Sequence, residues 1–61
     1  MNAAALIKLF KIAVADAKAI RKEALRINAV KALTGAYVAK LTALGVDHVD
    51  ALLMLNDAYN A

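Results

Sequence analysis

The spacing of apolar residues is the feature of this chain that most limits how it can fold. Apolar side chains recur every three or four residues along its first part, at Leu6, Leu9, Phe10, Ala13, Ala17, Ile20, Ala24 and Ile27. This spacing places them on one face of an α-helix. The chain has no proline and two glycines, and it is rich in alanine, leucine and lysine, which favour helix. We therefore predict an all-α fold.

A second helical stripe follows the first one, with apolar residues at Val30, Leu33, Tyr37, Leu41 and Leu44. Between the two stripes the apolar spacing is three residues three times running, from Ala24 to Leu33, so the apolar face drifts around the helix. We predict a bend or break near Asn28, within this drift. A break at Thr34–Gly35 is the competing interpretation, and one long, overwound helix is the third.

The clearest helix boundary lies at Gly45, which can adopt a positive φ at the end of a helix. Asp47 can then cap the next helix, and Asp50 adds negative charge near the positive end of that helix's dipole. We predict a last helix from about His48 to Tyr59. The expected order is a long basic N-terminal helix, a bent middle segment and a short apolar C-terminal helix after Gly45.

The short length limits how this fold can be stabilised. A chain of 61 residues forms one domain at most, over residues 1–61, which we expect to be a helical hairpin or a three-helix unit. A domain of this size buries only about 60% of the surface of its unfolded chain. The chain has no cysteine and one histidine, His48, so disulfides and multi-histidine zinc sites are excluded. We expect no cofactor, and association remains as the source of added stability.

Charge divides the chain into two parts. Residues 1–40 carry all eight basic side chains against two acidic ones, a net charge of +6, whereas residues 41–61 carry three aspartates and no cation, a net charge of −3. A basic stripe lies opposite the apolar face of the predicted first helix, at Lys8, Lys11, Lys18, Lys22 and Arg26. Three interpretations stay open for it: a solvated face, a contact with an acidic partner, or a contact with the phosphates of nucleic acid or membrane.

The predicted last helix is apolar on nearly every side, so we expect other protein to cover it. The predicted interface residues are Leu52, Leu53, Leu55, Tyr59, Val49 and Met54. We expect this surface to complete the core across a subunit boundary. His48 and Asp50 lie close together and could act as acid and base, but the chain has no cysteine or serine to act as the nucleophile. We therefore do not expect an enzyme.

The boundary at Gly45 also resembles parts of two known motifs. The stretch Ala39–Asp47 resembles the first helix and turn of a helix-turn-helix, which implies that the following helix reads DNA. That helix carries aspartates and no Arg, Lys or Gln that could reach base edges. Leu44-Gly45-Val46 before Ala51-Leu52 is similar to the loop of a ubiquitin-associated domain, although Val46 replaces the aromatic residue of that loop.

These patterns favour a non-enzymatic interaction or structural protein, as a homo-oligomer or as a small subunit of a larger assembly. A phage or plasmid accessory product, such as a virion component or an inhibitor of a host protein, fits this size. The alternatives are a protein that binds nucleic acid phosphates without sequence readout and a membrane-active peptide of bacteriocin type. The longest uncharged stretch has eight residues, Ala32–Ala39, against the roughly 20 of a spanning helix. With no signal-peptide pattern, the expected location is the cytoplasm or an assembled particle.

Overall fold

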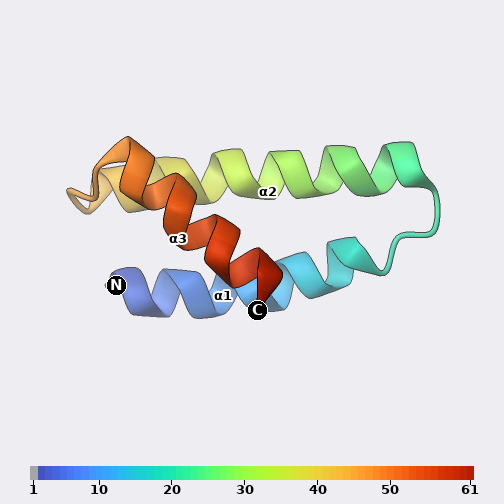
Figure 1. Ribbon diagram of the computed structural model, residues 1–61, viewed down its shortest axis with the longest axis horizontal. Coiled ribbons are helices and arrows are strands. Elements are labelled where there is room, and N and C mark those ends of the chain that lie inside the picture. Colours follow the sequence, from blue (N-terminus) through green and yellow to red (C-terminus); the bar gives the residue numbers. More distant parts are fainter. Residues whose placement is uncertain (1) are drawn as a thin grey trace.

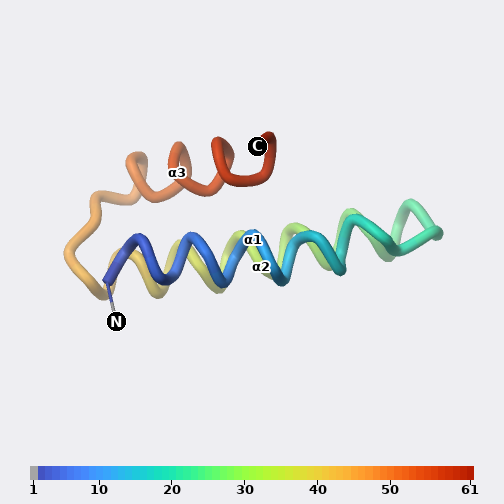
Figure 2. The backbone as a smooth tube through the Cα atoms, turned by 90° about the horizontal axis from the view of Figure 1, so that it is seen from below, coloured from blue at the N-terminus to red at the C-terminus, as the bar shows by residue number. Residues whose placement is uncertain are grey.

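A computed structural model describes residues 2–61, and within them the chain forms three α-helices and no strand. Helix α1 spans Ala3–Lys18, α2 spans Glu23–Ala43 and α3 spans His48–Asn60. Helices α1 and α2 form an antiparallel hairpin, and α3 crosses it diagonally (Figure 1). Figure 2 shows that α3 lies on one side of the layer made by α1 and α2. The predicted all-α, three-helix unit is confirmed.

Helices α1 and α3 each begin at a side chain that caps the backbone. The Oδ1 atom of Asn2 accepts a hydrogen bond from the Ala5 N–H at 2.8 Å. The Oδ2 atom of Asp47 accepts one from the Val49 N–H at 3.1 Å, and Gly45 just before it has a φ of 94°. Both caps satisfy N–H groups that a helix start leaves without partners. The predicted boundary between a glycine turn and a capped last helix is therefore confirmed.

The bend predicted near Asn28 or Gly35 lies elsewhere. Helix α2 is continuous through both residues, and the chain reverses at residues 19–22 instead. The first helix is thus shorter than predicted, with 16 residues against 21 in α2. The Nη1 atom of Arg26 donates to the carbonyl of Ile20 at 3.2 Å and ties the turn to α2. The drift in apolar spacing has another cause: α2 packs against both α1 and α3, so its apolar residues cover a wide arc.

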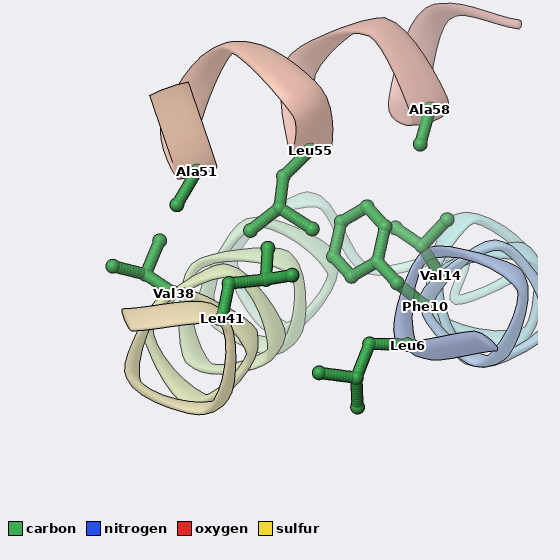
Figure 3. Close-up of a cluster of buried hydrophobic side chains, with 8 residues drawn as sticks. All are labelled: Leu6, Phe10, Val14, Val38, Leu41, Ala51, Leu55 and Ala58. Atoms are coloured by element: carbon green, nitrogen blue, oxygen red, sulfur yellow. The ribbon is translucent and has the colours of Figure 1, made fainter. Parts of the chain in front are cut away.

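The core lies where the three helices meet (Figure 3). Leu55 of α3 points between Phe10 of α1 and Leu41 of α2, and each of these side chains is at most 1% exposed. Tyr37 meets the Phe10 ring edge-on, with 5.4 Å between the ring centroids, a favourable aromatic geometry. The cluster is completed by the buried residues Leu6, Val14, Val38, Ala51 and Ala58. This core is built from one copy of the chain.

Helix α3 covers only part of the hairpin. The molecule measures 35 × 17 × 17 Å, whereas the 13 residues of α3 span about 20 Å at 1.5 Å per residue. The hairpin end that carries the turn at residues 19–22 extends beyond α3 (Figures 1 and 2). The accessible surface of 4128 Å² exceeds the roughly 3,800 Å² of a compact monomer of this mass. The third helix therefore leaves part of the hairpin exposed to solvent.

Candidate functional site

Within residues 2–61, several large apolar side chains stay at least 40% exposed: Leu9, Ile12, Leu25, Ile27, Leu44, Val49, Leu52 and Leu53. Single exposed apolar residues are normal on a protein surface, and only a contiguous group indicates an interaction site. Val49, Leu52 and Leu53 form such a group, because they lie at i, i+3 and i+4 on α3. We call these three residues the α3 patch.

A groove between α2 and α3 adjoins the α3 patch. It has a volume of about 330 Å³ and is lined by Phe10, Val30, Thr34, Leu52, Leu55, Asn56 and Tyr59. We call it the α2–α3 groove. Phe10 and Leu55 form its floor, since both are buried in the core. Leu52 belongs to both the patch and the groove, so the two form one continuous surface of mainly apolar character.

The structure separates the residues that the sequence predicted as an interface. Val49, Leu52 and Leu53 are 40–60% exposed and make up the α3 patch. Tyr59 is half-buried and lines the groove beside the patch. Leu55 is 1% exposed and closes the core of its own chain, so it offers a partner only the small surface that it shows at the floor of the groove.

Met54, the remaining predicted interface residue, lies on the other side of α3. It is half-buried and lines a second, more open hollow against α1, together with Ile7, Lys11, Asp57, Ala58 and Ala61. This hollow brings together a cation and an anion, Lys11 and Asp57, unlike the uncharged lining of the α2–α3 groove. Met54 therefore does not extend the α3 patch.

The predicted basic stripe is divided among α1, the turn and α2. Its members are placed as follows: Lys8, Lys11 and Lys18 on α1, Lys22 at the start of α2, and Arg26 within α2. The ammonium of Lys18 lies 4.1 Å from the centroid of the Tyr59 ring and donates a hydrogen bond to the Tyr59 carbonyl. Arg26 holds the carbonyl of Ile20 in the turn. Two of the five cations are therefore engaged within the fold.

Cations border the α2–α3 groove at two places. Lys18 lies at one end, through its contact with Tyr59, which lines the groove. Lys31 is exposed on α2 and precedes the groove residue Thr34 by three positions, which makes the two side chains neighbours on the helix surface. The spacing of residues along the sequence does not identify Lys31 and Thr34, because the groove exists only once α3 packs beside α2.

The α3 patch, in contrast, is bordered by anions. Asp50 precedes Leu53 by three residues and Asp57 follows it by four, so both carboxylates neighbour Leu53 on the helix surface. Asp47 adds a third carboxylate at the N-cap. An apolar, acidic patch thus lies beside an apolar groove with basic ends.

His48 and the carboxylates of the described residues do not gather at the α2–α3 groove. The part of the chain that the structure describes contains no cluster of three or more side chains that could ligate a metal ion. His48 is exposed at the start of α3, outside the lining of the groove. No helix in this part is both long and apolar enough to cross a membrane. The α3 patch and the α2–α3 groove are the surface on which the exposed apolar residues of α3 meet a hollow with an uncharged lining.

Comparison with known proteins gives no further guide, since the chain matches no family model, no curated protein and no solved structure. The fold and surface therefore carry the functional argument. They define a small three-helix protein with many exposed apolar residues, which is consistent with a protein-interaction surface.

Proposed function

We propose that this protein is a non-enzymatic interaction protein, acting as a homo-oligomer or as a small subunit of a larger assembly. One observation carries the proposal: Val49 and Leu53 are 60% and 57% exposed on the same helix whose Leu55 closes the core. Full burial of such a side chain contributes about 1.5–3 kcal/mol. More than half of that contribution is missing at each of the two residues until a partner covers them.

The size and surface of the chain fit an accessory protein of a phage or plasmid, either a component of the virion or an inhibitor of a host protein. The groove lining supports a role in binding and not in catalysis, because Thr34, Asn56 and Tyr59 supply its only polar groups within residues 2–61. None of these is a histidine or a carboxylate, the residue types that most often act as a general acid or base.

The two alternative functions have less support. Binding of phosphates would use the basic stripe, and two of its five cations, Lys18 and Arg26, already donate hydrogen bonds to carbonyls of the fold. A membrane-active peptide gains its helical structure from lipid, whereas the buried contact of Phe10 with its neighbours supports a core formed in water. Anisotropy with labelled nucleic acid and circular dichroism with lipid vesicles test these alternatives.

Sedimentation velocity over a range of micromolar concentrations tests the main proposal, with Leu53→Asp as the variant. A charge at this position is incompatible with an apolar contact, so the variant should sediment as a monomer where the original chain associates. Leu25→Asp is the matched control, because Leu25 is 56% exposed and lies nine residues, or two and a half turns, from Thr34 on α2. Identical sedimentation of all three proteins as folded monomers would contradict the proposal.

A further inference from the structure

We propose that the α2–α3 groove binds the α3 patch of a second copy of this chain, and that the two copies do so reciprocally about a two-fold axis. This inference rests on the proposed function and adds the partner, the surface and the pairing. The charges of the groove and of the patch are complementary, and the end of the hairpin beyond α3 is open to a second helix.

The groove selects a helix that is both apolar and acidic. Its lining, from Phe10 to Tyr59, carries no charged side chain within the described residues, so it fits apolar groups. Its borders carry Lys18 and Lys31, and residues 19–22 beyond it add Arg21 and Lys22. A carboxylate beside the entering apolar side chain would meet these cations, whereas a basic helix would be repelled.

Helix α3 of a second copy has both properties. Its exposed side presents Val49 and Leu53, one turn apart, and its carboxylates Asp50 and Asp57 neighbour Leu53. Among residues 2–61, α3 is also the helix that carries no lysine or arginine, while α1, α2 and the turn between them hold these residues. The chain therefore supplies the ligand that its own groove selects.

The position of Leu52 makes the pairing reciprocal. Leu52 lies in the α3 patch and also lines the groove. When the α3 patch of the second copy enters the groove of the first, the groove of the second copy therefore comes to lie beside the α3 patch of the first. Such self-complementary contacts close as a two-fold dimer. In this arrangement the two α3 helices lie next to each other across the axis.

The uncovered end of the hairpin provides room for the second helix. Ile27 is 43% exposed and precedes Thr34 by seven residues, two turns along the same side of α2. It lies in the second turn of α2, close to the turn at residues 19–22, and the hairpin end that carries this turn extends past α3 (Figure 1). It therefore adds apolar surface on the side of α2 that holds the groove residues. The α3 helix of a partner would cover Ile27 and the groove together.

Charge-reversed variants test the pairing. The first variant carries Asp50→Lys and Asp57→Lys, and the second carries Lys18→Glu and Lys31→Glu. Each alone places like charges together and should lose about tenfold or more in self-affinity. An equimolar mixture restores both attractive contacts, so we expect a mixed dimer in native mass spectrometry and sedimentation velocity. A third variant, Lys8→Glu with Lys40→Glu, has the same net charge as the second, but neither residue has a groove-lining residue three or four positions away on its helix. It should self-associate normally and fail to rescue the first.

The outcomes separate this inference from the proposed function. If Leu53→Asp abolishes association but the mixture does not restore it, the protein is an interaction protein with another pairing, and the inference is wrong. If the original chain is a monomer and Leu53→Asp changes nothing, the proposed function itself fails. Circular dichroism checks that each variant is helical. Should a double variant fail to fold, the single changes Asp57→Lys and Lys31→Glu carry the same mixing test.

Discussion

Truncating Leu55 and Leu53 to alanine, one at a time, should distinguish the core side of α3 from its binding surface. Both changes remove the same atoms, at positions two residues apart, so a difference in the lost stability reflects where each side chain lies. Leu55 is 1% exposed and lies between Phe10 and Leu41 (Figure 3). Its truncation removes buried contacts and leaves a cavity, at a cost of about 2–5 kcal/mol. Leu53 is 57% exposed, so its truncation in the monomer should cost about 1 kcal/mol or less.

The size of the chain makes this difference easy to measure. At about 0.05–0.15 kcal/mol per residue, 61 residues have a free energy of unfolding of roughly 3–9 kcal/mol. Leu55→Ala therefore removes a large part of the total. Each kcal/mol shifts the midpoint of thermal unfolding by about 4–8 °C in a domain of this size, so Leu55→Ala should lower it by at least about 8 °C. Leu53→Ala should lower it by no more than about 8 °C.

Thermal unfolding followed by circular dichroism, repeated at several protein concentrations, tests this reasoning. Association stabilises a folded protein by mass action, so the difference between the original chain and Leu53→Ala should grow with concentration. The effect of Leu55→Ala should already be complete at the lowest concentration. Equal losses for the two variants in dilute solution would refute the assignment of Leu55 to the core and Leu53 to the surface.

The remaining predictions concern the glycines and the cap of α3, and all use the same unfolding measurement. Gly35→Ala should stabilise the chain by about 0.5–1 kcal/mol, because this helical position has open space for a methyl group. Gly45→Ala should destabilise it by about 1–2 kcal/mol, because the φ of 94° strains any residue with a Cβ; effects of the same sign would contradict the two backbone assignments. Asp47→Ala should cost about 1 kcal/mol by removing the acceptor of the Val49 N–H, whereas Asp47→Asn should retain most of the cap. An equal loss in both Asp47 variants would show that the cap contributes nothing.

The boundary before α3 was predictable because its causes are local. A glycine that adopts a positive φ and an aspartate that caps the next helix are properties of two or three neighbouring residues. Gly45 and Asp47 behave as their types dictate, and the helix predicted from about His48 to Tyr59 spans His48–Asn60. Tertiary contacts are not needed to place this boundary.

The turn between α1 and α2 was missed because it lacks the usual turn residues. It consists of Ala19, Ile20, Arg21 and Lys22, with no glycine, proline or asparagine. The available signal is electrostatic: Lys18 lies in the last turn of α1 and Glu23 in the first turn of α2, the signs that the helix dipoles favour. The hydrogen bond from Arg26 to the carbonyl of Ile20 forms only after the chain has reversed, so the sequence alone does not show it.

The faces of α1 and α2 could be predicted only in part. The predicted stripes include Leu9 and Leu44, which are 42% and 46% exposed, and omit Val14 and Val38, which are buried. Leu9 and Val14 lie at opposite edges of the apolar face of α1, and Val38 lies at one edge of the apolar face of α2, whereas Leu44 is the C-cap residue that follows α2. Which edge is buried depends on the side of the hairpin on which α3 packs, as Figure 2 shows, and the spacing within a single helix does not contain that information.

The way in which α3 packs on one side of the hairpin also explains why it retains a surface for a partner. Against the hairpin it buries Ala51, Leu55 and Ala58, of which two are alanines that let the helices approach closely but contribute little apolar area. On its outer side it exposes Val49, Leu52 and Leu53, which are larger. A helix that packs on one side only has its large apolar residues on that side. Helix α3 has small residues toward the hairpin and large apolar residues toward solvent, which is the pattern of a helix that protein covers on both sides. One copy of this chain covers only the side that faces the hairpin.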